Sequence, residues 1–242
     1  MRTLKDSWFI MRSDFRGDTL SMLGRFVLSF LFMGYLGGMT GTVVNHVLAD
    51  QNRTLLVDFV FLSLMPLLGF SISRRSMKYW SEDSYTRMLA YLRSLPIPSK
   101  VMLARRKLQA VGTLTINGFL FFSIIYWVSD NFRKELPMPS YIAFALTWIG
   151  VGLIISGLYI FIEYLFSGKA YLLITVLIVM VSMGVSLLIL LGNGNLFFYS
   201  VSYSKEWGLF SPMMWGSLLL GTISVQLFSK WTIHRLQSRD LV

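Results

Sequence analysis

Cysteine is absent from the 242 residues, so the chain has no disulfide, no thiolate metal site and no cysteine nucleophile. Charge is scarce as well, because only 14% of the residues are charged, against about 25% in a typical soluble domain. Apolar residues make up 55% of the chain instead. This composition excludes an ordinary soluble domain and predicts an integral membrane protein.

Six long apolar stretches account for most of the chain. A bilayer core about 30 Å thick requires about 20 apolar residues per helix. Backbone amides must be paired in lipid, and barrel strands alternate over about 10 residues, whereas these stretches are longer and apolar on all sides. We therefore expect an all-α integral membrane protein of one domain with six transmembrane helices. The stretches are 26–48, 55–72, 110–128, 141–166, 171–192 and 210–229.

The 22 Lys and Arg residues are distributed unevenly over the connections. Alternate connections hold 18 of them on one side and four on the other. Basic residues favour the cytoplasmic side, so we expect a multi-pass protein of the cell (cytoplasmic) membrane with both termini inside. The excess charge also favours contact with anionic lipid, and no groove-reading motif indicates nucleic acid. The 18 lie in 1–25, 73–109, 167–170 and 230–242.

The N-terminal segment 1–25 combines charge with large apolar residues. Four of these recur at helical spacing on one face, with Lys5, Arg12 and Arg16 on the other side. Such a pattern is typical of a helix lying in the membrane surface, and a frayed cytoplasmic segment is the alternative. The four are Leu4, Trp8, Met11 and Phe15.

The cytoplasmic connection 73–109 is the longest and carries nine basic residues. Ser81 is a suitable N-cap, and an apolar stripe at i, i+3, i+4 and i+7 follows it. Pro96 and Pro98 end this helix, and Ser99 caps the next one. An amphipathic helix here buries its stripe against the membrane surface or in a groove of a soluble partner. The stripe consists of Tyr85, Met88, Leu89 and Leu92.

The segment from Leu92 to Lys100 reads Leu-Arg-Ser-Leu-Pro-Ile-Pro-Ser-Lys, and a basic patch and a new span follow it. It resembles the "SLPIS(R/K)…K" element of ABC-2-type transporter permeases, which lies between the second and third of six spans. Pro98 departs from that pattern, since the family usually has a small polar residue there. The six spans, the inside termini and the N-terminal surface helix are also similar to that family.

The resemblance implies that 79–93 is a coupling helix that docks on a separate ABC ATP-binding subunit. Its docking residues would be Tyr85, Met88, Leu89, Leu92, Leu95 and Pro96. It also implies a second permease subunit, like or unlike this chain, and export of an amphiphilic substrate such as a peptide, lipid or drug. The alternative is a non-transporting membrane protein, such as an immunity, sensor or assembly factor, whose loop binds a partner.

No phosphate-binding loop is present, because the sequence around Gly168-Lys169-Ala170 lacks the upstream glycine spacing and the hydroxyl. ATP and Mg would therefore be bound by the partner subunit, and we expect no cofactor on this chain. His46 and His234 are the only histidines and lie at opposite membrane faces in the expected topology. We therefore expect no enzyme activity, catalytic centre or metal site.

Three polar residues within the spans are candidates for a translocation pathway, because polar groups at membrane depth are costly. Asp58 lies near the outer end of the second span, where an interfacial acid reached by water is the alternative. Glu163 lies near the inner end of the fourth span, where it reaches the interface beside Lys169 or lines the pathway. Asn117 lies deeper and either hydrogen-bonds a neighbouring helix or lines the pathway.

Small residues mark positions where helices pack closely. Gly37 and Gly41 have the four-residue spacing typical of close helix packing, against a neighbouring helix or a dimer mate. Ser182, Gly184 and Ser186 offer a similar surface in the fifth span. The aromatic outer segment 193–211 is a re-entrant gate in the family interpretation, and an interfacial aromatic belt is the alternative.

Overall fold

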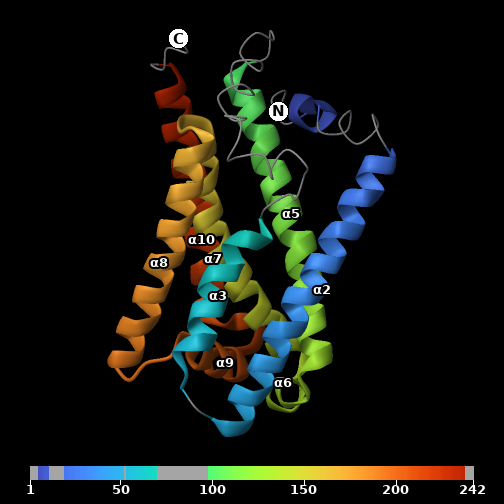
Figure 1. Ribbon diagram of the computed structural model, residues 1–242, viewed down its shortest axis with the longest axis vertical. Helices are drawn as coiled ribbons and strands as arrows, with labels where there is room; N and C mark the ends of the chain where they lie inside the picture. The colour runs from blue at the N-terminus through green and yellow to red at the C-terminus, as the bar shows by residue number, and fades with distance from the viewer. Residues whose placement is uncertain (1–4, 11–18, 52, 70–97, 238–242) are drawn as a thin grey trace.

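The protein is a bundle of α-helices in the computed structural model, which describes residues 5–10, 19–51, 53–69 and 98–237 (Figure 1). No strand occurs in these ranges. Four helices contain segments that are long and apolar enough to cross a membrane. They are α2 (Thr19–Asp50), α5 (Ser99–Val128), α7 (Met138–Leu165) and α8 (Gly168–Leu191). The prediction of an all-α membrane protein is confirmed at this level.

The predicted second and sixth spans have a different form. Helix α3 (Leu55–Leu68) has 14 residues and is therefore about 21 Å long, shorter than a bilayer core of about 30 Å. It contains Pro66 and is followed by Gly69, two residues that disfavour continuation of a helix. Helix α9 (Leu196–Trp207) and the 3₁₀ turn η2 (Gly208–Phe210) meet α10 (Pro212–Gln237) at an 87° bend. The described residues thus provide four candidate spans, or five with this bent pair.

Short polar motifs determine where several helices begin. Ser129 Oγ accepts the backbone N–H of Phe132 at the start of α6 (Asp130–Glu135), and Ser167 Oγ accepts that of Ala170 in α8. Asn195 Oδ1 accepts the N–H of Phe198 at 3.0 Å in α9. These N-caps pair backbone donors that the first helical turn leaves unpaired.

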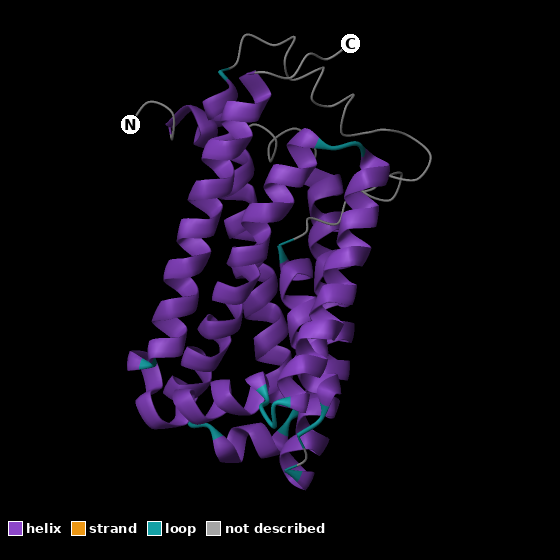
Figure 2. Cartoon of the chain, turned by 90° about the vertical axis from the view of Figure 1, so that its left-hand side faces the viewer, coloured by secondary structure: helices purple, strands orange, loops and turns teal. Residues whose placement is uncertain are grey.

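The helices form two closely packed pairs, α7 with α10 and α2 with α5. Helix α9 lies across the end of the bundle that also carries α6 (Figures 1 and 2). Residues 5–10 and the last turns of α10 lie at the opposite end (Figure 1). We call these the α9 end and the terminal end of the bundle; in the expected topology they are the outer and inner ends.

Glycine permits the closest helix contacts. A Cβ atom at Gly150 of α7 would lie 2.7 Å from the backbone carbon of Ser217 in α10. Gly37 and Gly41 of α2 lie against α5, where added Cβ atoms would be 3.1 Å from Ile124 Cβ and 3.0 Å from Val128 Cβ. Both helix pairs can approach this closely only because glycine has no side chain at these positions.

The surface suggested around Gly184 is not packed in this way. Nothing lies within 4 Å of a Cβ placed at Gly184, so α8 does not pack closely there against another described helix of this chain, and packing against a dimer mate stays a prediction. Helix α8 is largely exposed along its length, whereas half of α7 is buried.

Residues 5–10 are helical and lie on the start of α5, where the hydroxyl of Ser7 donates a 3.0 Å bond to the carbonyl of Val101. Trp8 and Phe9 of the same segment are exposed. The other predicted surface residues of this segment, Leu4, Met11 and Phe15, lie outside the described residues. So does the predicted coupling helix 79–93 with its docking residues, and Leu95 and Pro96 beyond it.

Candidate functional site

Asp58 connects α3 to α9. Its two carboxylate oxygens accept the backbone N–H groups of Leu196 and Phe197, each at 2.8 Å. These are the first two residues of α9, so the carboxylate lies at the helix end that favours negative charge. Asp58 is 1% exposed, and the interpretation as an interfacial acid reached by water is therefore wrong.

Other polar bonds fasten the same junction. The amide of Asn195 donates to the carbonyl of Thr54 at 3.2 Å, and Arg53 donates to the carbonyl of Asn193 at 2.6 Å. The segment before α9 is thereby bound to the segment before α3. Asn195 has a double role, because its side chain also caps α9.

A cluster of aromatic rings fills the bundle beside this junction. Phe144 of α7 is fully buried, and its ring centroid lies 5.0 to 6.4 Å from six other rings. The indole N–H of Trp148 donates to the hydroxyl of Ser200 in α9 at 3.1 Å. Aromatic packing and a buried hydrogen bond thus hold α9 against α7. The six rings belong to Phe61, Phe122, Phe132, Tyr141, Trp148 and Phe197.

Asn117 joins three helices in the middle of the bundle. Its amide donates to the carbonyl of Leu68 at the end of α3, at 2.9 Å. Its carbonyl oxygen accepts the hydroxyl of Ser29 in α2, at 2.7 Å. Asn117 is 3% exposed, so this arrangement matches the helix-bonding alternative for the side chain. Leu68 is the last residue of α3, and Asn117 thus supplies a donor for a carbonyl at the helix end.

Glu163 lies near the terminal end and is paired with Arg106. Its Oε2 atom accepts from Nε of Arg106 at 2.8 Å and from Nη2 at 2.7 Å. The side chains are 9% and 18% exposed, so water screens the pair only weakly. The pair holds α5 to α7 at their expected inner ends. The sequence interpretation instead placed Glu163 beside Lys169.

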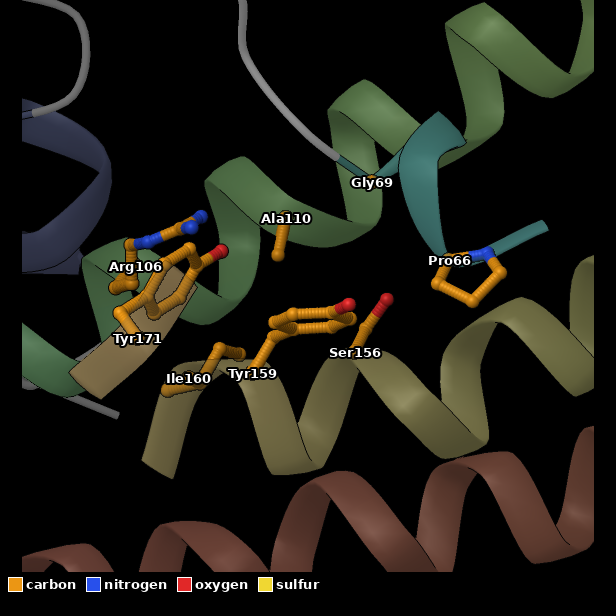
Figure 3. A pocket seen from close by; sticks show the side chains of 8 residues that line it. All are labelled: Pro66, Gly69, Arg106, Ala110, Ser156, Tyr159, Ile160 and Tyr171. Atoms are coloured by element: carbon orange, nitrogen blue, oxygen red, sulfur yellow. The ribbon is translucent and has the colours of Figure 1, made fainter. Parts of the chain in front are cut away.

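A pocket adjoins this ion pair between α3, α5, α7 and α8 (Figure 3). Arg106 and Tyr171 lie at one end of it, Tyr159 and Ser156 in the middle, and Pro66 and Gly69 at the other end. Its enclosed space is small and has room for about one water molecule. The hydroxyl of Ser156 donates to the carbonyl of Gly152 at 2.8 Å. The pocket therefore presents a guanidinium and three hydroxyl groups within an apolar bundle.

The three candidate pathway residues are not brought together. Asp58 lies at the α9 end, Asn117 in the middle, and Glu163 near the terminal end, each with its own hydrogen-bond partner. Nor do three His, Asp or Glu side chains converge as a metal site within the described ranges. Arg106, Tyr159 and Tyr171 were not among the sequence candidates. The run Arg105-Arg106-Lys107 at the start of a span was the available signal for the first of them.

The fold and these interactions define an all-α, multi-pass membrane protein. No protein-family model, curated protein or solved structure matches the chain.

Proposed function

We propose that the chain is the membrane-spanning permease subunit of an ABC-2-type exporter. It pairs with a second permease subunit and with a separate ATP-binding subunit, and moves an amphiphilic substrate such as a peptide, lipid or drug. ATP and Mg belong to the partner, and this chain performs no catalysis.

The observation that carries the proposal is the bent segment formed by α9, η2 and α10. Its 87° bend places α9 across one end of the bundle, where a re-entrant gate between the last two spans is expected. Asp58 and the Trp148–Ser200 bond attach α9 to α3 and α7. Movement of either helix would therefore move the gate.

The terminal end supports coupling to a cytoplasmic partner. Helix α5 begins at Ser99, directly after the predicted docking segment, and residues 5–10 lie on its first turn through the bond from Ser7 to Val101. Arg106 then ties α5 to α7 two turns further on. Movement of the loop would thus reach α7 through this partly buried ion pair.

Co-purification tests the proposal. The tagged chain is isolated from its native membrane in mild detergent with the products of adjacent genes, and the eluate is assayed for ATPase activity. We expect an ATP-binding subunit that is lost in the Leu89→Glu and Leu92→Glu variants. Arg87→Glu, which places the same acid on the opposite face of the predicted helix, is the matched control and should retain it.

Absence of any associated ATPase would favour the non-transporting alternative. Association that survives both Leu→Glu substitutions would refute the coupling-helix assignment.

A further inference from the structure

We propose that the exposed side of α10 faces lipid, and that Trp215 and Trp231 at its two ends lie at the two interfaces of the bilayer. The spacing of these tryptophans fits a hydrocarbon core about 24–27 Å thick. Lipid, and not a second copy of the chain, covers this surface. The proposal does not depend on the proposed transport function.

The exposed side of α10 carries a large apolar residue at every fourth position. Three aliphatic side chains, each at least half exposed, lie between two tryptophans that are 55% and 59% exposed. Rows with this spacing are inclined to the helix axis, so the tryptophans lie toward opposite edges of the exposed side. The α10 row consists of Trp215, Leu219, Ile223, Leu227 and Trp231.

In the part of the chain that the structure describes, exposed tryptophans occur only toward the two ends of the bundle. Trp148 is the one described tryptophan that is buried. Tryptophan is enriched at membrane–water interfaces, where its ring contacts apolar groups and its N–H reaches the wet layer. The distribution therefore favours an interface at each end. The exposed residues are Trp127, Trp207 and Trp215 at the α9 end, and Trp8 and Trp231 toward the terminal end.

Local contacts hold the two tryptophans of α10 against the bundle. The indole N–H of Trp215 donates to the carbonyl of Leu209 in η2 at 3.1 Å. The ring centroid of Trp231 lies 5.7 Å from that of Phe228 and 6.3 Å from that of Phe161 in α7. Both rings are therefore packed at a defined depth while a large part of each stays accessible to lipid.

Charge at the inner end of the α10 row complements lipid phosphate. Lys230 precedes Trp231 and is exposed, and His234 and Arg235 lie in the last turn of α10, which contains no acidic residue. Basic side chains at this depth are attracted to anionic headgroups. A two-fold contact between two α10 rows would instead bring like charges together, which is unfavourable. The charges therefore favour lipid over a second copy.

Two helices give the thickness of the apolar layer. Trp215 and Trp231 are 16 positions apart, which corresponds to about 24 Å along α10. The exposed apolar residues of α8 run from Leu173 to Leu191, 18 positions or about 27 Å. A typical hydrocarbon core is about 30 Å thick, and helix tilt shortens both projected lengths further. The exposed surface thus fits a core slightly thinner than the typical one.

Depth measurement by electron paramagnetic resonance tests the α10 row. Because the chain has no cysteine, one introduced cysteine carries a nitroxide in the otherwise native full-length protein in liposomes. Accessibility to oxygen relative to a water-soluble nickel chelate should be highest at Ile223→Cys and should fall toward Trp215→Cys and Trp231→Cys. Lys134→Cys, at an exposed lysine of the α9 end, is the reference for a site in water.

Two results of this measurement would overturn the proposal. A depth at either tryptophan position equal to that at Ile223→Cys would remove the interface from the ends of the row. Low accessibility to both probes at Leu219→Cys and Ile223→Cys would show that a second copy, and not lipid, covers the row.

Lipids of graded chain length test the thickness. Quenching of tryptophan fluorescence by brominated lipid measures the relative affinity of the full-length chain for phosphatidylcholines from dimyristoleoyl to dierucoyl. We expect the highest affinity for dipalmitoleoyl lipid and about threefold lower affinity for dierucoyl lipid, because hydrophobic mismatch costs free energy for each ångström. Equal affinities across the series, or a maximum at dioleoyl or longer chains, would overturn the assigned thickness.

A double variant tests whether the tryptophans set this thickness. Trp215→Leu combined with Trp231→Leu extends the apolar row at both ends and should move the maximum to longer chains, with the other exposed tryptophans still reporting the quenching. Phe119→Leu, at an exposed position of α5 between the two ends, is the control and should leave the maximum unchanged. An unchanged maximum in the double variant would contradict the role of the two tryptophans.

Discussion

The carboxylate of Asp58 accepts the backbone N–H of Phe197 at 2.8 Å, although 139 residues separate them in the chain. Its other oxygen accepts the N–H of Leu196 at the same distance. One side chain on the short helix α3 thus satisfies two donors that α9 leaves open at its start. The position of α9 across the bundle depends on this contact and on the aromatic cluster around Phe144.

Asp58→Ala should destabilise the protein by about 1–3 kcal/mol, because two buried N–H groups lose their acceptor. Asp58→Asn keeps one acceptor oxygen and should lose less. Reversible unfolding in mixed micelles, followed by tryptophan fluorescence, measures both. Equal stability of Asp58→Ala and the parent would show that water or another group replaces the carboxylate.

The Arg106–Glu163 pair should behave as a coupled unit. Arg106→Gln or Glu163→Gln alone leaves a buried partner charge, and should cost near the lower end of the ~3–5 kcal/mol found for fully buried pairs. The lower end applies because the side chains are 18% and 9% exposed. The double variant removes both charges and should lie within about 1 kcal/mol of the parent. A double-mutant cycle of unfolding free energies tests this, and simple additivity would contradict it.

Close approach of α7 and α10 should make Gly150 intolerant of any side chain. Gly150→Ala places Cβ 2.7 Å from the backbone carbon of Ser217, and backbone cannot rotate away. We expect a loss of about 1–3 kcal/mol from overpacking.

Gly184→Ala is the matched control, since nothing lies within 4 Å of its Cβ. It should be neutral, or up to about 1 kcal/mol more stable through helix propensity. Thermal unfolding of the two variants side by side tests the contrast. Similar losses in both would mean that α8 packs more tightly than the structure places it.

The helices themselves were largely predictable. The long apolar runs predicted α2, α7 and α8. The predicted and observed helix ends agree within a few residues, except that α2 begins earlier than predicted. Helix α5 was expected at this place, but Ser99 is its first residue and Pro98 occupies the N-cap position without a side-chain bond, so the prediction that Ser99 caps the helix is wrong. Helix α3 ends sooner than predicted because hydropathy alone does not register Pro66 and Gly69 within an apolar run. The bend before α10 was foreseen only as an aromatic, re-entrant segment.

The partners of polar residues were not predictable from local sequence. Asp58 and Leu196 are 138 residues apart, and Arg106 and Glu163 are 57 apart, so no helical spacing relates them. The sequence instead offered the nearby Lys169 as a partner for Glu163. Gly184 was a sequence candidate for close packing and Gly150 was not, yet Gly150 is the one that lies against α10. Nothing lies within 4 Å of a Cβ placed at Gly184, because packing depends on which helix faces meet.

Phe144 should be the most sensitive aromatic residue of the cluster. Phe144→Ala removes a fully buried ring that lies beside six others, and the resulting cavity should cost about 3–5 kcal/mol. Phe119→Ala, at a side chain that is 71% exposed, is the control and should change stability little. Unfolding free energies in micelles check both variants. Comparable effects at the two positions would contradict the placement of the cluster at the centre of the α9 end.

The absence of cysteine makes membrane topology directly testable, because any introduced thiol is the sole target of a maleimide. Lys134→Cys lies on α6 at the α9 end, and Lys100→Cys on the first turn of α5 at the terminal end; both native lysines are exposed. The 18-to-4 distribution of basic residues places the first outside and the second inside.

A membrane-impermeant maleimide should therefore label Lys134→Cys in intact cells, and Lys100→Cys only after the membrane is permeabilised. The cysteine-free parent controls for background labelling. The reverse pattern would place α9 in the cytoplasm and the pocket of Arg106 at the outer face. The proposed gate would then be excluded, because it depends on this orientation.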